Sequence, residues 1–254
     1  MNNIESKIID ISTLDSDILT LSLSNDNVYK IILVNINKDF TVDVTLKEYT
    51  NAQISVLNEN SNNNIKFVGN IEENAFLEIY FADFATGKFK VESDINLNGN
   101  YAKCVWHLGA LSGNVDKKTF DISMYHNTSN TESLIDNYGV CKDDSKLVFS
   151  GICHVKQGAH KSKAHQNAKI MVFDEKSDAI AKPILKIDDN DIEASHAAGV
   201  GKISDDQLFY LTTRGISLAT ARQLITYGYL KPILNGFDNE DIRKHISEKI
   251  EGGF

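Results

Sequence analysis

The feature that most constrains the fold of this chain is a long succession of strand-like runs with very few hairpin signals between them. From Lys30 to about Ile192, runs rich in Ile, Val, Leu, Phe or Tyr recur at intervals of roughly 10–14 residues, bounded by Asn, Asp, Ser or Gly. This spacing is typical of an all-β sandwich, a barrel or a β-solenoid. The runs are Lys30–Ile36, Thr41–Leu46, Gln53–Leu57, Asn64–Ile71, Ala75–Phe81, Lys88–Val91, Tyr101–His107, Thr119–His126, Lys146–His154 and Lys169–Phe173.

The connections between the runs favour the solenoid. Asn98-Gly99 is the best hairpin signal in the β region, whereas a fold built of hairpins should show several. Asparagine is abundant at the ends of the runs, and its tolerance of left-handed backbone suits tight corners between coils. The sequence carries no strict repeat, so periodicity alone leaves the sandwich and the barrel open.

The pattern changes to short helices after Gly201. Ser204 followed by Gln207 forms a capping box, and the helix that it starts ends at Arg214-Gly215. A second helix is predicted from Ser217 to a C-terminal cap at Gly228, and a third from Asp238 to about Glu251. We therefore divide the chain into a β region, residues 1–203, and a C-terminal helical region, residues 204–254.

Charge and composition exclude some classes of function. The formal net charge is −9 with no basic cluster, which argues against nucleic-acid binding. The sequence shows neither a signal peptide nor an apolar run of the roughly 20 residues that span a membrane. Three cysteines, Cys104, Cys141 and Cys153, do not suggest a secreted disulfide framework. We expect a cytoplasmic protein.

A glycine-rich segment near the end of the β region resembles a phosphate-binding loop only superficially. Gly199-Val200-Gly201-Lys202 has His196 where a Walker A loop has its first glycine, and Ile203 where it has Ser or Thr. Both the backbone cradle and the magnesium ligand are therefore missing. We interpret the segment as a turn that leads into the first helix.

Two other function classes stay open at this stage. His154, His160 and His165 lie close together in sequence near Cys153, and imidazole with thiolate suits zinc or iron, so one alternative is an independent metalloprotein or metalloenzyme. The spacing matches no common zinc finger, and adjacent Cys153 and His154 would face opposite sides of a strand. The other alternative is a carbohydrate-binding or carbohydrate-active solenoid, for which Trp106 is the only tryptophan available.

The segment from Lys182 to Tyr229 resembles the C-terminal core of the SufB/SufD family of iron–sulfur cluster assembly scaffold proteins. A Pro-x-Leu-x-Ile strand and an acidic turn precede Ser195-His196, and Asp-x-Leu-Phe-Tyr-Leu and Arg-Gly-Ile follow at the start of the helical region. Upstream, Gly158-Ala159-His160 and His165-Gln166-Asn167-Ala168 are similar to the preceding segment of the family. The resemblance covers about Val148–Tyr229.

The resemblance implies a right-handed parallel β-helix with a helical C-terminal subdomain. Two such cores pair in the family, as a dimer with a SufB-like chain or with a second copy, and the helical subdomain docks the ABC-type ATPase SufC. The chain would then be a non-catalytic scaffold of the SUF system, and the ATPase would carry the nucleotide chemistry. We expect the docking surface on Leu208–Gly215 and Ala221–Tyr229, with Phe209, Tyr210, Arg214 and Gly215 as candidate contact residues.

The resemblance also assigns a candidate metal ligand. His196 matches a family histidine at a strand end, which either holds iron of a transient cluster at the dimer interface or only hydrogen-bonds the paired subunit. Many members have a cysteine where this chain has Ala194, and SufB-type chains have an acid where it has Ala197. Because thiolates are the usual cluster ligands, this chain is SufD-like and is expected to hold no cofactor tightly on its own.

Overall fold

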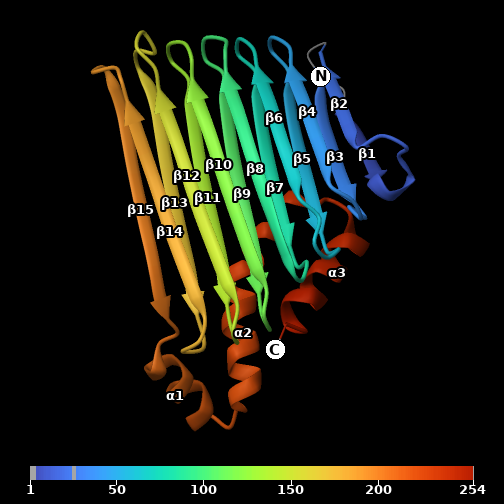
Figure 1. Cartoon of the computed structure of the whole chain (residues 1–254), viewed down its shortest axis with the longest axis vertical. Coiled ribbons are helices and arrows are strands. Elements are labelled where there is room, and N and C mark those ends of the chain that lie inside the picture. Colours follow the sequence, from blue (N-terminus) through green and yellow to red (C-terminus); the bar gives the residue numbers. More distant parts are fainter. Residues whose placement is uncertain (1–3, 25–26, 254) are drawn as a thin grey trace.

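The chain winds as a parallel β-solenoid with two flat sheets. The computed structural model describes residues 4–24 and 27–253, and it divides the strands between an eight-stranded and a seven-stranded sheet. Strands of odd number form the larger one, sheet A, and strands of even number form sheet B (Figure 1). Each strand pairs in parallel with the strand two further along the chain, so every coil contributes one strand to each sheet. This confirms the predicted fold class.

The coils are regular enough to be given by their strand bounds. Sheet A contains β1 (Ile4–Asp10), β3 (Val28–Val34), β5 (Asn51–Asn58), β7 (Phe76–Asp83), β9 (Lys103–Ser112), β11 (Glu132–Cys141), β13 (Ser162–Val172) and β15 (Ile192–Lys202). Sheet B contains β2 (Ile18–Leu23), β4 (Phe40–Leu46), β6 (Ile65–Ile71), β8 (Lys88–Leu97), β10 (Lys117–His126), β12 (Lys146–Val155) and β14 (Asp178–Ile187). A 3-10 helix, η1 (Ile11–Thr13), joins β1 to β2.

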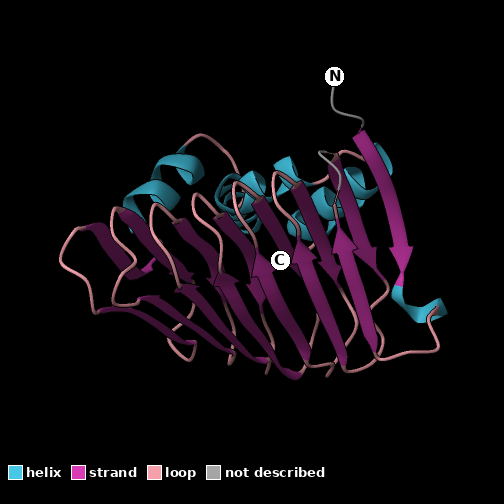
Figure 2. Ribbon diagram, turned by 90° about the horizontal axis from the view of Figure 1, so that it is seen from above, coloured by secondary structure: helices cyan, strands magenta, loops and turns pink. Residues whose placement is uncertain are grey.

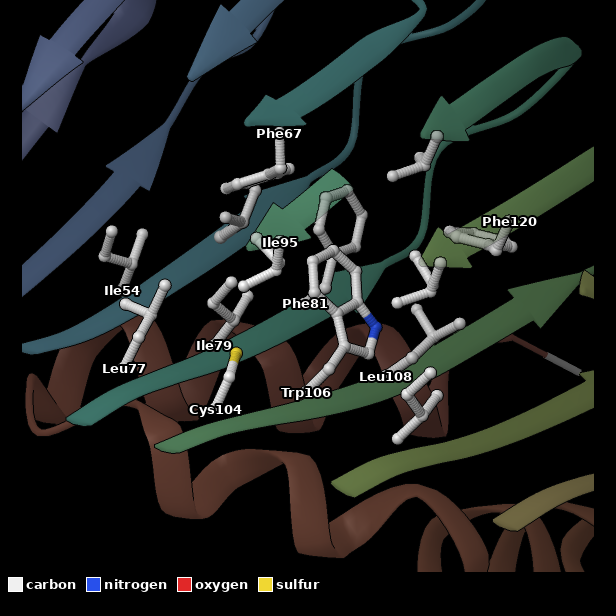
Figure 3. Close-up of a cluster of buried hydrophobic side chains, with 14 of the residues drawn as sticks. Ile54, Phe67, Leu77, Ile79, Phe81, Ile95, Cys104, Trp106, Leu108 and Phe120 are labelled. Atoms are coloured by element: carbon white, nitrogen blue, oxygen red, sulfur yellow. The ribbon is translucent and has the colours of Figure 1, made fainter. Parts of the chain in front are cut away.

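The space between the two sheets is the main hydrophobic core. Alternate residues of each strand point inward, and the inward ones are almost all buried apolar side chains. Within this core the rings of Phe67 and Phe81 pack against Trp106, with the Phe81 and Trp106 rings stacked at 5.9 Å between centroids, and Phe120 packs edge-on against Phe81 (Figure 3). Trp106 is fully buried, so it contributes nothing to the exposed aromatic groove that a carbohydrate-binding solenoid would need.

The corners between strands are built on residues with left-handed backbone. Such a residue with positive φ recurs once per coil at each of two stacked corners, and asparagine fills five of these positions. The predicted role of asparagine is therefore confirmed. One series is Asn35, Asn62, Gly87, Asn114 and Asp143, and the other is Tyr49, Asn74, Tyr101, Asn130 and Lys161.

The best hairpin signal of the sequence lies at one of these corners. Asn98-Gly99 connects β8 to β9, which belong to different sheets, so the segment makes no hairpin. A Cβ atom at Gly99 would lie 1.9 Å from the backbone nitrogen of Glu73 in the preceding coil. Glycine is required here because two stacked corners approach each other too closely for a side chain.

The coils lengthen towards the C-terminal end of the solenoid. In sheet B, Thr41 pairs with Ile18, 23 residues before it, whereas Asp178 pairs with Lys146, 32 residues before it. The strands lengthen in parallel, from 6 residues in β2 to 11 in β15. This gradual change explains why the sequence shows no strict repeat.

Three α-helices and a 3-10 helix follow β15. They are α1 (Asp205–Thr213), α2 (Leu218–Leu230), η2 (Lys231–Gly236) and α3 (Glu240–Glu251). The predicted caps are confirmed at Ser204, which accepts from the Gln207 amide, and at Ser217. The predicted stop at Gly228 is wrong, because α2 continues to Leu230. None of the described helices is long and apolar enough to cross a membrane.

The helices from α2 onward cover part of the outer face of sheet A. Outward apolar residues such as Leu57, Ala82 and Val140 form a second core with Leu230, Phe237 and other residues of the helical region. In Figure 2 the helices lie along one side of the solenoid, and Figure 1 shows α1 beyond the end of β15. In Figure 2 none of the described helices covers sheet B or the remaining part of sheet A.

Candidate functional site

The last coil of the solenoid presents its inner face to solvent. Every second residue of β15, from Ile192 to Lys202, pairs with a buried residue of β13. These residues of β15 therefore lie on the inward side of sheet A. Within the described chain no further coil covers them. His196 and Val200 of this face are accordingly exposed, and Leu185 of β14 is only partly buried. The result is an open end of two free strand edges and apolar side chains around one imidazole.

His196 lies within a strand and not at its end, which corrects the prediction. It pairs with Gln166 midway along β15, and the strand continues through the glycine-rich segment to Lys202, which pairs with Val172. The interpretation of Gly199–Lys202 as a turn is therefore also wrong. The parallel ladder with β13 supplies hydrogen bonds along the whole segment, which outweighs the weak strand preference of glycine.

The coil beneath His196 contains a buried polar contact. The Gln166 side chain donates to the backbone oxygen of Ile184 at 2.8 Å and lies next to the thiol of Cys153. Burial raises the pKa of Cys153 to about 11, although hydrogen bonds from Ser133 and Gln166 favour the thiolate. At neutral pH Cys153 is therefore a protonated thiol inside the core.

The other two cysteines are also free and buried. Burial raises the pKa of both thiols, and for Cys104 the neighbouring Cys153 and Glu78 add to the rise. Thiolates are the cluster-ligating form of cysteine. As folded, this chain presents an imidazole at its open end but no thiolate among its three cysteines.

The three histidines of the metalloprotein alternative are not brought together. His154 faces Asp188 at 2.7 Å, His160 faces Asp189 at 3.0 Å, and His165 contacts Ser195 at 2.8 Å. Cys153 and His154 point to opposite faces of β12, as predicted. Over residues 4–24 and 27–253 we find no group of three or more His, Cys, Asp or Glu side chains arranged to hold a metal ion.

A second exposed apolar feature lies on the first two helices. Phe209 and Tyr210 of α1 are 70% and 57% exposed, and Leu218 and Leu224 of α2 are about half exposed. We call these four residues the α1–α2 surface. Arg214 lies over the Tyr210 ring at 5.1 Å, and Gly215, with a φ of 84°, makes the turn into α2.

Leu218 of the α1–α2 surface and most of the open end were missed by sequence reasoning. Leu218 directly follows the Ser217 cap, just outside the predicted range Ala221–Tyr229, whereas Leu224 lies within that range. The apolar side chains of Leu185 and Val200 could be recognised only once β14 and β15 were known to be the last coil. Alternation within 183–187 and 192–200 was the available signal.

Comparison with protein families extends the match well beyond the C-terminal motifs. A family model described as "SUF system FeS cluster assembly, SufBD core domain" matches residues 35–229, which is well over half of the chain. The matched region contains β4 to β15, together with α1 and nearly all of α2. The solenoid itself is therefore part of the family domain.

Individual relatives agree with this assignment. The iron-sulfur cluster assembly protein SufD of Bacillus subtilis is 37% identical over 134 residues, which are 53% of this chain and 31% of that protein. SufB of the same organism is 28% identical over 184 residues, 71% of this chain and 40% of that protein. A SufBD family protein of Mycobacterium leprae is 24% identical over 217 residues, 83% of this chain and 25% of its own length.

The matches cover about a third of the length of the first of these relatives, so they do not by themselves assign the functions of the whole relatives to this chain. The family model, however, covers the solenoid from β4 onward, the strand with His196 and the helices of the α1–α2 surface as one continuous region. The chain belongs to the SufBD core family of iron–sulfur cluster assembly proteins.

Proposed function

We propose that this protein is a non-catalytic, SufD-like scaffold subunit of a SUF assembly complex, which pairs with a SufB-like chain and docks a SufC-like ATPase. The observation that carries the proposal is the open last coil, where two unpaired strand edges and an apolar face surround His196. A free parallel edge with exposed apolar residues is a template for another chain.

Pairing at the open end would complete the coil. The inward sides of β14 and β15 present Leu185, Ile187 and Val200, of which Ile187 and Val200 are 42% and 47% exposed. Covering apolar side chains of this size contributes about 1.5–3 kcal/mol each when burial is complete. The same contact would enclose His196 between two chains, where an imidazole can bind iron or donate a hydrogen bond.

The partner would have to supply the sulfur ligands. The thiols of Cys104, Cys141 and Cys153 are buried and their pKa values are raised, so they are poor cluster ligands in this fold. A transient iron–sulfur cluster, which is the cargo of the pathway, would then be ligated mainly by a SufB-like chain, and His196 would complete the set of ligands. This division of labour supports a SufD-like role.

The α1–α2 surface is our candidate for ATPase docking. Exposed aromatic residues together with an arginine are the composition of protein-interface hot spots, and Phe209, Tyr210 and Arg214 gather at one end of the molecule. Gly215 fixes the turn between the two helices by its left-handed backbone. A rigid helix pair of this kind can bind a partner without ordering a flexible loop.

Coexpression with the SufB-like chain and the ATPase from the same source tests the proposal. Gel filtration with mass determination should find all three chains in one complex, and a chain that stays alone at micromolar concentrations of both partners would overturn it. Within the complex, His196→Ala separates the two roles of the imidazole. Loss of cluster absorbance with an intact complex indicates a ligand, whereas loss of pairing indicates an interface contact.

Phe209→Glu should weaken ATPase binding by about 2 kcal/mol, or roughly thirtyfold in Kd, because it places a charge in the core of the contact. Binding of the purified ATPase is measured by calorimetry or by interferometry. Tyr49→Glu is the matched control, since Tyr49 is 56% exposed in the corner between β4 and β5, at the opposite end of the strands from α1. Equal affinities for the two variants would remove the α1–α2 surface from the docking site.

A further inference from the structure

A row of polar side chains crosses the outer face of sheet A, and the proposed function does not use it. At its centre His107 of β9 lies between two carboxylates on the neighbouring strands. Its Nε2 is 3.4 Å from Oε1 of Glu78 on β7, and its Nδ1 is 3.9 Å from Oδ2 of Asp136 on β11. Tyr80 stacks on the imidazole at 4.5 Å and donates its hydroxyl to Glu78 at 3.0 Å.

The surroundings favour the charged form of His107. Burial alone would lower the pKa of the imidazole, but Asp136 and Glu78 outweigh it and raise the pKa to about 9. His107 in turn lowers the pKa of Glu78. The imidazole is therefore a cation shared by two carboxylates at neutral pH.

The other titratable groups near this row do not remove the positive charge of His107. The charge of Lys30 on β3 also lowers the pKa of Glu78, and Lys30 forms an ion pair with Asp238, which lies just before α3. Burial raises the pKa of Tyr80 and of Tyr229 on α2 to about 12, so both stay neutral up to alkaline pH. Tyr138 packs against Tyr229, and Lys169 of β13 lies over the Tyr138 ring.

The helical segment η2 rests directly on this row. A Cβ atom at Gly236 would lie 2.1 Å from the Tyr80 ring, so the backbone of η2 contacts the ring that stacks on His107. The Gly236 carbonyl accepts hydrogen bonds from the side chains of Gln53 and Ser55 on β5. His107, Asp136, Tyr229 and Pro232 line a cavity of about 30 Å³ between the sheet and the helices.

We propose that the imidazolium of His107 is a clamp that seats η2 on sheet A, so that loss of this charge loosens the helical region from the solenoid. The charge holds Glu78 and Asp136 in place on either side, and Glu78 orients Tyr80 under Gly236. Without the charge, two carboxylates on the same half-buried face lose their common counter-ion and move toward water. Tyr80 then loses its fixed position beneath η2.

Hydrogen exchange and histidine NMR on the whole chain test this inference. Protection factors of the amides in Lys231–Gly236 should fall at least about tenfold between pH 7 and pH 10, and they should level off once the His107 ring signals have titrated. Tenfold corresponds to a difference of one pKa unit between the seated and released states. Protection that stays constant while the His107 signals titrate would overturn the clamp.

Three variants sharpen the test. His107→Gln should show the low protection already at pH 7, with no further fall on raising the pH. Glu78→Gln keeps the imidazole but removes one of its two carboxylates, so the midpoint should move towards neutral pH; this variant decides the matter if His107→Gln does not fold. His245→Gln removes a similar pair, which His245 of α3 makes with Glu59 after β5, and should behave as the parent chain. An unshifted midpoint in Glu78→Gln would contradict the inference.

Discussion

Lys118→Met should lower the free energy of unfolding by about 3–5 kcal/mol, because it leaves a buried carboxyl group without its cation. The ammonium group of Lys118 lies 2.7 Å from Oδ2 of Asp83, and both side chains are fully buried. Lys118 also donates to the Leu111 carbonyl, and Asn58 donates to Asp83 at 2.8 Å. Burial raises the pKa of Asp83 even beside this lysine, so the carboxyl group depends strongly on its partners.

The double variant Asp83→Asn with Lys118→Met is the decisive control. It removes both charges while the residue at position 83 can still accept from Asn58, so most of the lost stability should return. Urea unfolding of the four proteins at pH 7 gives the coupling energy of the pair. If the loss of stability in the double variant equals the sum of the losses in the two single variants, the two side chains are not coupled.

Acidification should destabilise the protein through His126, by about 3 kcal/mol between pH 7 and pH 4. Burial lowers the pKa of His126 to about 4, well below its usual value of 6.5, although a hydrogen bond to Thr131 opposes the shift. Between these two pH values His126 becomes protonated in the unfolded chain but stays largely neutral in the folded chain. The contribution of His126 is therefore complete above pH 6.5 and is lost as the pH falls towards 4.

The comparison of the parent chain with His126→Gln isolates this effect. The Gln amide can bond to Thr131 and Ser133, which lie 2.7 and 2.8 Å from the imidazole nitrogens, but it carries no titrating proton. The difference in stability between the two proteins, measured by urea unfolding at several pH values, should shrink as the pH falls. Curves that remain parallel from pH 7 to pH 4.5 would show that His126 is not the group responsible.

Strand alternation was enough to predict most coils but not all of them. Thr119–His126 and Lys146–His154 were found almost to the residue, because apolar inward positions alternate with polar outward ones. β11 was missed because its inward positions include Ser133 and Asn137, which hide the alternation. The first two strands were ambiguous because most of their residues are exposed in an end coil that has a neighbour on one side only.

The polar contacts of the molecule lay outside the reach of sequence reasoning. Glu78 meets His107 only because a coil of 27 residues sets β7 beside β9, and Asp83 of β7 meets Lys118 of β10 only across the space between the two sheets. A local sequence pattern does not reveal which residues of neighbouring coils face each other, because the number of residues per coil changes along the chain. His196 was found through the family resemblance, but its position within β15 depended on the ladder with β13.

The gradual lengthening of the coils has a consequence for self-association. A head-to-tail stack of copies would set the 11 residues of β15 against the 7 of β1, and the overhanging backbone groups would stay unpaired. Two molecules that meet through their wide ends face strands of equal length instead, related by a two-fold axis with antiparallel edges. Such an arrangement is closed after one contact, whereas the other would propagate into a fibre. A contact between two wide ends would therefore leave fewer backbone groups unpaired than a contact of β15 with β1.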